Sequence, residues 1–457
     1  MPDATRSPAG PATFRDVFGQ PEYRAVYAAT VLSWVGDYMT KAAVSVLVYQ
    51  QTKSVALSAA SFAISYLPWL VGGPLLATLA ERRSYRNVMV FCDALRMCLI
   101  IILAIPGMPI PVMMALLFAI TLANPPSQAA RSALLPLILT GDRLVLGISL
   151  NLTTGQAAQV VGYVAGAGIG VVNPRLALLI DAVTFAASAL IIRFGVRWRP
   201  PAMRSEDRSH LLQETAAGFR LVFGTPVLRA IAIIVFTSML FAIVPEGLAA
   251  AWASERVGDS AQRGVAQALI MAASPVGFIL GGLIIGRLVP PATRQALIRP
   301  FAILAPLVLV PALFDPPPAV VSLLAALCGF AVAGVMPAAN ALFVQALPNG
   351  FRARAFGVMG SGTQAVQGIA VITTGLIADR FSIPLVVGVW SLAGVLLMLL
   401  AMIPWPSQGQ IEAAIADAAA QNSMSVAPPA AKAPESAMVD VGADAPAASP
   451  AGAGNAR

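Results

Sequence analysis

Long apolar stretches alternate with short polar turns along the chain from about Tyr27 to Ile403. Each stretch has roughly 17 to 25 residues, the length an α-helix needs to cross the hydrocarbon core of a bilayer. A transmembrane β-barrel would show shorter segments of alternating polarity, whereas these stretches are continuous and rich in Leu, Ala and Val. The pattern therefore predicts an all-α membrane protein with about twelve transmembrane helices.

The predicted spans cover residues 27–49, 56–80, 88–105, 111–130, 146–172, 176–192, 227–252, 265–288, 298–314, 319–347, 356–377 and 384–403. They divide the chain into an N-terminal segment, two halves of six spans, a central loop and a tail, over residues 1–26, 27–192, 193–226, 227–403 and 404–457. The tail is rich in Ala, Pro, Ser and Gly, so it lacks the apolar residues needed to bury a core. We expect it to be disordered.

The distribution of arginine predicts the orientation in the membrane. The first 20 residues have no apolar signal region, so we expect the first span to direct insertion. Connections after even-numbered spans are rich in arginine, for example Arg82, Arg197 and Arg352, and the other connections carry few. Because basic loops stay inside, we expect a multi-pass protein of the cell membrane with both termini in the cytoplasm.

The two predicted halves retain traces of a duplication. FRDVFGQPEYRAV, Phe14 to Val26, aligns with FRLVFGTPVLRAI, Phe219 to Ile231, and eight of the thirteen residues are identical. Two similar halves of six spans, with both termini on one side, lie in parallel topology about an axis along the membrane normal. This pseudo-symmetry predicts the major facilitator fold, with the functional cavity between the halves.

Composition excludes several classes of function. With 58% hydrophobic and only 11% charged residues, and a mean hydropathy of +0.79, the chain is not an ordinary soluble domain. The net charge of +8 is spread over separate loops, which favours the lipid bilayer over nucleic acid as a partner. One histidine and three scattered cysteines argue against an intramembrane enzyme, and we expect no metal and no cofactor. No GxxxxGK[ST] phosphate loop is present, so the chain is not itself a P-loop ATPase.

Four residues of the first span share one helical face. Trp34, Asp37, Tyr38 and Lys41 stand at i, i+3, i+4 and i+7. A charge inside a bilayer is costly and is usually kept for a transport pathway, so Asp37 is a candidate proton-coupling group and the other three are candidates for the substrate cavity. Alternatively, Asp37 and Lys41 form an ion pair that only neutralises itself within the span.

Glu246 in the seventh span is the second candidate proton-coupling group. It has no basic residue within one helical turn and lies about one turn from the depth of Asp37 on the matching face of the other half. Alternatively, it is hydrated near the outer interface. The repeated pairs Gln156 with Gln159 and Gln364 with Gln367 line one helical face each, and we expect them in the substrate cavity or between helices.

Charged groups also cluster around the second connection. GPLLATLAERRSYRNV, Gly73 to Val88, resembles the signature motif of the major facilitator superfamily, with Glu81 where aspartate is usual and Ser84 where glycine is usual. Such charges can latch a closure at the cytoplasmic side. The predicted cytoplasmic gate comprises Glu81, Arg82, Arg86, Asp93 and Arg96.

Further motifs point to one branch of this superfamily. Gly36-Asp37, Asp93 to Arg96, and ARSALLP from Ala130 to Pro136 resemble the macrolide-efflux and siderophore-export-like branch, while the antiporter motif of span five is only partial. The resemblance implies a secondary active transporter. We expect proton-coupled efflux of a small amphipathic compound, a drug or natural product, by a monomer using alternating access. An importer or uniporter of a small metabolite, and a permease subunit of an ATP-driven complex, remain alternatives.

Overall fold

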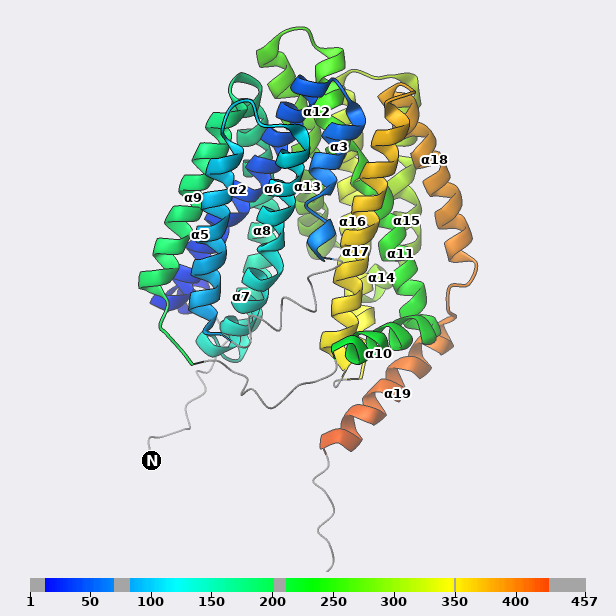
Figure 1. Cartoon of the computed structure of the whole chain (residues 1–457). Coiled ribbons are helices and arrows are strands. Elements are labelled where there is room, and N and C mark those ends of the chain that lie inside the picture. Colours follow the sequence, from blue (N-terminus) through cyan, green and yellow to red (C-terminus); the bar gives the residue numbers. More distant parts are fainter. Residues whose placement is uncertain (1–12, 70–82, 201–210, 349–350, 427–457) are drawn as a thin grey trace, which may run out of the picture.

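The computed structural model describes residues 13–69, 83–200, 211–348 and 351–426 (Figure 1). Within these ranges it is built of helices and contains no β-strand. A helix lies at the position of each predicted span, and nine helices of the described part are long and apolar enough to cross a membrane. The predicted all-α membrane architecture is confirmed.

The N-terminal half contains α2 (Pro21–Thr52), α3 (Val55–Ala63), α5 (Tyr85–Leu103), α6 (Ile110–Leu122), α7 (Asn124–Ile138), α8 (Asp142–Val172) and α9 (Pro174–Gly195). The C-terminal half contains α11 (Pro226–Ala242), α12 (Val244–Arg256), α13 (Ser260–Leu288), α15 (Ile298–Leu307), the 3-10 helix η1 (Val310–Phe314), α16 (Pro318–Gln345), α17 (Arg352–Ala378) and α18 (Ile383–Met402). Shorter or peripheral helices are α1 (Phe14–Phe18), α10 (Leu211–Gly224), α14 (Pro291–Ala296) and α19 (Gln408–Val426).

Local sequence explains where many helices begin. Proline occupies one of the first positions of helices such as α2, α9 and α16, where its missing N–H costs no hydrogen bond. Elsewhere a polar side chain caps the helix: Ser54 accepts from the Leu57 amide and Asp259 from the Gln262 amide. These signals set the helix ends, and apolar burial holds the helices together.

Several predicted spans differ in their bounds from the observed helices, and residues 70–80 of the second span lie outside the described ranges. The fourth span was expected to end at residue 130, but the helical run of α6 and α7 continues to Ile138. The ninth span is α15 followed by η1, because prolines near its centre remove backbone N–H donors that a continuous α-helix would use.

The prediction of a disordered tail from residue 404 is wrong for its first part, because α19 forms there. Its sequence is rich in alanine, a strong helix former, and Ile411, Ala414 and Ile415 pack against the core of the C-terminal half. In Figure 1, α10 and α19 lie on the same side of the molecule, called the α10 side below. The central loop likewise holds a helix, α10, which packs on α17.

The two halves pack against each other through equivalent helices. In the N-terminal half, α3 holds the second span and contacts α17, which is the fifth span of the other half. Reciprocally, α13 is the second span of the C-terminal half and contacts α8, the fifth of the N-terminal half. This exchange is what a pseudo-twofold axis between parallel halves requires, so the predicted fold is confirmed.

Polar contacts also join the halves on the side opposite to α10. Asp379, at the end of α17, accepts hydrogen bonds from the Ser54 hydroxyl and the Ala56 amide, both at 3.0 Å. Nearby, the Tyr49 hydroxyl lies 3.4 Å from a carboxylate oxygen of Glu255. A carboxylate of one half therefore caps the N-terminus of α3 in the other half, where the helix dipole favours negative charge.

Candidate functional site

A cavity of about 390 Å³ lies between the two halves. Its lining comes from α2, α8 and the segment after α3 on one side, and from five helices of the C-terminal half on the other. The lining residues are Tyr38, Lys41, Tyr66, Gln156, Gln159, Met239, Ala242, Ile243, Glu246, Ser274, Pro275, Phe278, Gly329, Val332, Met336, Asn340, Gln364 and Gln367. The predicted residues Tyr38, Lys41, Glu246 and all four glutamines are therefore brought together.

Glu246 is the acidic group of the cavity wall. Pro245 occupies one of the first positions of α12, so Glu246 stands in the first turn of that helix, near its positive end. The side chain is buried, with 5% exposure. Its Oε2 accepts hydrogen bonds from the Tyr163 hydroxyl at 3.1 Å and from Gln159 Nε2 at 3.2 Å. Both donors are on α8, so a carboxylate of the C-terminal half is held by the N-terminal half.

The basic group of the cavity is Lys41, which is surrounded by aromatic rings. Its Nζ lies 5.0 Å from the ring centre of Tyr66, 5.2 Å from that of Tyr38 and 5.9 Å from that of Phe62. A ring face attracts a cation, and the attraction is stronger away from water. Lys41 makes no ion pair with any carboxylate in the described part of the chain.

Amide and apolar side chains complete the lining. Because Gln156 and Gln159 stand three residues apart on α8, and Gln364 and Gln367 three apart on α17, each pair presents its amides to the same space. Phe278 supplies an aromatic surface among the aliphatic residues of the C-terminal half. A site of this kind can hold an apolar molecule and orient its polar groups by hydrogen bonds.

Sequence reasoning missed four polar or aromatic lining residues, Tyr66, Ser274, Phe278 and Asn340. None of them is charged or repeated between the halves, so nothing in the sequence set them apart from structural residues. The repeat analysis did mark Pro275, beside Ser274, as the counterpart of a proline in the second span.

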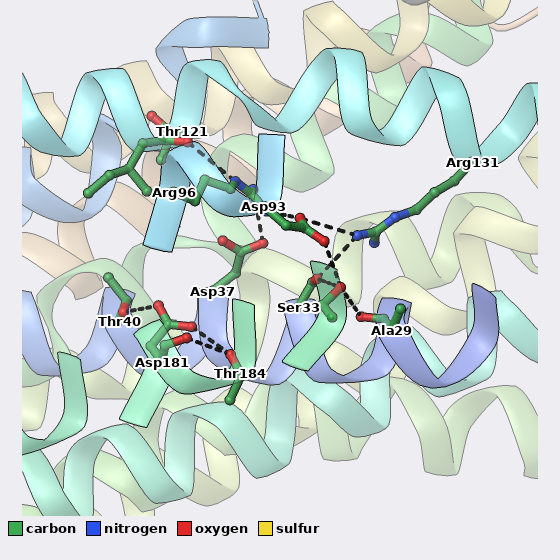
Figure 2. Close-up of polar contacts among 12 residues, drawn as sticks. Ala29, Ser33, Asp37, Thr40, Asp93, Arg96, Thr121, Arg131, Asp181 and Thr184 are labelled. Atoms are coloured by element: carbon green, nitrogen blue, oxygen red, sulfur yellow. Dashed lines mark hydrogen bonds and ion pairs between the residues drawn. The ribbon is translucent and has the colours of Figure 1, made fainter. Parts of the chain in front are cut away.

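Asp37 is paired with a residue other than Lys41. Its Oδ2 lies 3.3 Å from Nη2 of Arg96 on α5, as Figure 2 shows. Asp37 and Trp34 are not among the residues that line the cavity, and the Trp34 ring faces α8 at Gly155. The expected single stripe on α2 is therefore divided: Tyr38 and Lys41 line the cavity, whereas Trp34 and Asp37 do not.

The Asp37 pair belongs to a larger buried cluster in the N-terminal half (Figure 2). Asp93 Oδ1 lies 3.9 Å from Arg96 Nη1 and 3.8 Å from Nη2 of Arg131 on α7. Its Oδ2 accepts a hydrogen bond of 2.6 Å from the Ser188 hydroxyl. Asp93 and Arg96 are almost completely buried, so the carboxylates and guanidiniums compensate one another away from solvent.

The residues predicted as a cytoplasmic gate are only partly described. Asp93 and Arg96 pair at i, i+3 as expected, but they lie inside the N-terminal half, and Arg86 stands in the first turn of α5. Glu81 and Arg82 lie outside the described residues. Arg131 follows the predicted end of the fourth span, but it is buried inside α7, which extends to Ile138.

No group of three or more His, Cys, Asp or Glu in the described ranges is arranged to hold a metal ion.

Comparison with known proteins places this architecture among transporters. The chain is 25% identical over 377 residues to the multidrug efflux pump Tap of Mycolicibacterium fortuitum, which covers 77% of this chain and 88% of that protein. Its structure resembles a variant of the nucleoside transporter NupG, with a TM-score of 0.67 and 16% identity over 84% of this chain and 100% of that one. It also resembles a POT family transporter in complex with 5-aminolevulinic acid, with a TM-score of 0.64 and 13% identity over 83% and 95% of the two chains. These two structural likenesses concern the fold alone.

The family model described as Major Facilitator Superfamily matches residues 26–321. The match begins in α2 and ends at the start of α16, so it includes the six spans of the N-terminal half and the first three of the C-terminal half. Together with the paired six-span halves and the cavity between them, it leads to one conclusion: this chain belongs to the major facilitator superfamily of membrane transporters.

Proposed function

We propose that the protein is a proton-coupled exporter of small amphipathic molecules in the cell membrane, with both termini in the cytoplasm. The observation that carries the proposal is Glu246, a buried carboxylate on the wall of the central cavity that is hydrogen-bonded across the boundary between the halves. An acidic group in this position senses both the contents of the cavity and the contact between the halves.

The hydrogen bonds of Glu246 suggest how its protonation could act on the conformation. Hydrogen bonds to an ionised carboxylate are stronger than those to a neutral acid. Ionised Glu246 therefore holds α12 more firmly against α8 through Tyr163 and Gln159. Uptake of a proton weakens this connection and favours separation of the helices, so proton binding and the alternation of access are linked.

The cavity chemistry supports an amphipathic substrate. One wall offers Met239, Ile243, Phe278 and Met336, while amides and a single basic group, Lys41, face the same space. A volume of about 390 Å³ suits a small organic molecule. The efflux activity named for the Mycolicibacterium relative supports export as the direction.

The test uses proteoliposomes of known orientation with an imposed pH gradient and three probes, ethidium, tetracycline and erythromycin. We expect the wild type to move at least one probe against its gradient in exchange for protons. Glu246→Gln should abolish proton-driven transport and leave membrane insertion intact. The matched control is Glu412→Gln on the exposed face of α19, which should transport like the wild type. Transport that needs ATP, or unchanged coupled transport by Glu246→Gln, would contradict the proposal.

A further inference from the structure

Asp181 is a buried carboxyl group to which the proposed mechanism gives no role. It lies on α9 with 0% exposure and faces α2 rather than the cavity. As Figure 2 shows, its neighbours are the hydroxyl groups of Thr40 and Thr184. No cationic group of the described residues forms an ion pair with it. A buried carboxyl group with hydroxyl neighbours alone raises the question of its protonation state.

The hydrogen bonds around Thr184 answer this question. The Thr184 hydroxyl lies 2.8 Å from the backbone carbonyl oxygen of Asp181 and 3.0 Å from its Oδ1. A hydroxyl has one proton to donate, and the shorter contact directs it to the backbone carbonyl. A proton on the carboxyl group would satisfy the remaining contact, between Thr184 Oγ1 and Asp181 Oδ1, without sharing the single Thr184 proton.

A neutral Asp181 satisfies every polar atom of this group. Its Oδ1–H donates to Thr184 Oγ1, and its Oδ2 accepts the hydrogen bond of 2.5 Å from the Thr40 hydroxyl. An ionised Asp181 would instead have two competing acceptors around the single proton of Thr184. The geometry therefore fits the carboxylic acid better than the carboxylate.

The charges nearby lead to the same assignment independently. Asp37 and Asp93 are matched by Arg96 and Arg131, so the formal charges of the cluster already cancel. A further carboxylate at Asp181 would leave a net negative charge in the protein interior, which is strongly unfavourable.

The close packing of α2 against α9 also depends on a glycine beside the Asp181 carboxyl group. A side chain at Gly36 would collide with the Asp181 carboxyl group and the Thr184 hydroxyl. The missing side chain of Gly36 thus lets the carboxyl group lie directly against α2, one residue before Asp37.

From these observations we infer that Asp181 is a proton-binding site at the interface of α2 and α9, occupied in this conformation and separate from Glu246. The charged groups that act on it are Asp37 on α2 and Arg96 on α5, while α8 carries no charged side chain between Arg143 and its end. Only the use of this proton in transport rests on the proposed function; its presence does not.

Infrared spectroscopy of the purified full-length protein at neutral pH tests the site, because a protonated carboxyl group has a carbonyl band that a carboxylate lacks. All variants carry Glu246→Gln to remove the other buried carboxyl group for which no ion pair is described. We expect a carboxylic acid band that is lost in Asp181→Asn. The band should persist in Asp259→Asn, a control that caps α13 and lies outside this cluster. An unchanged spectrum in Asp181→Asn would overturn the proposal.

A second variant covers the case in which Asp181→Asn does not fold. Thr184→Val removes the acceptor of the carboxyl proton, so the carbonyl band should shift to higher frequency. Absence of any acid band, both before and after this substitution, would show that Asp181 is ionised. The spectra need no substrate, so a failure of proton-driven transport would leave this result unaffected.

Discussion

Asp37 forms its ion pair with Arg96 of another helix and not with Lys41, which lies about one turn away on its own helix. Lys41 is four residues away on the same helix, and sequence spacing alone makes it the natural partner. In the structure Asp37 points toward α5 and meets Arg96, while Lys41 points into the cavity toward aromatic rings. Two residues on neighbouring parts of one helical face thus have separate roles, one within the N-terminal half and one toward the substrate.

We predict that a double-mutant cycle will separate these two pairings. Arg96→Met should lower the free energy of unfolding by about 3 kcal/mol, because it leaves buried carboxylates without their partner. The coupling energy of Asp37→Asn with Arg96→Met should exceed about 1 kcal/mol, and that of Asp37→Asn with Lys41→Met should stay below about 0.5 kcal/mol. Reversible unfolding in detergent measures both, with exposed Arg287→Met as the control. A larger coupling energy with Lys41 than with Arg96 would contradict this prediction and support an ion pair between Asp37 and Lys41 within α2.

The sequence was sufficient to find the charged residues and the glutamines of the cavity but not their partners. Glu246 and the glutamine pairs were recognisable because polar groups in apolar spans are costly and because the glutamine pair of one half recurs in the other. Arg131 could not be recognised as a buried residue, because hydropathy predicts that the fourth span ends at residue 130, whereas α7 continues to Ile138. Pairings such as Glu246 with Tyr163 join residues far apart in the chain, and only packing brings them together.

Among the helices, the contact between α13 and α16 depends on glycine. A Cβ on Gly277 would collide with the backbone carbonyl of Ala326, and one on Gly329 with the carbonyl of Ser274. Glycine lets the two backbones approach closely, which increases dispersion contacts where lipid offers no hydrophobic gain. This contact fixes the position of Ser274 and Pro275 at the cavity wall.

We predict that Gly277→Ala destabilises the C-terminal half by about 2 kcal/mol through this collision. Gly282→Ala on the same helix is the matched control, because a Cβ there meets no atom within 4 Å. Both substitutions gain the same helix propensity, so their difference isolates the clash. Thermal unfolding in detergent measures it, and equal stability of the two variants would contradict the packing argument.

Helices were predictable from apolar length, whereas their ends and breaks were not. Hydropathy located each span because a bilayer sets a minimum length for an apolar helix. It could not show that α7 continues to Ile138 or that α19 forms beyond the last span, since these segments depend on helix propensity and contacts with other elements. α19 has few large apolar residues, and its three contacting residues are recognisable only once the neighbouring core is known.

At the scale of the whole molecule, the polar contacts described between the two halves include a group on the side opposite to α10. Asp379 bonds the start of α3, and Tyr49 contacts Glu255 at the same end. These contacts lie outside the apolar interior, so they can break in water without leaving buried charges. They favour the conformation seen here, in which this side is held closed, over one in which the halves separate there.

We predict that Asp379→Ala shifts the molecule away from this conformation. Loss of the bonds to Ser54 and Ala56 should cost about 1 kcal/mol, which changes the ratio of the two conformations roughly fivefold. The measurement uses a background without the native cysteines and spin labels at Asp142 and Gln345, both exposed on the α10 side. In Asp379→Ala we expect a larger population of molecules with a short distance between the two labels. Asp259→Ala is the control, because Asp259 caps α13 within a single half and its loss should leave the distance distribution unchanged. An unaltered distribution in Asp379→Ala would mean that the apolar contacts of α3 with α17 and of α13 with α8 hold this side closed without help from the carboxylate.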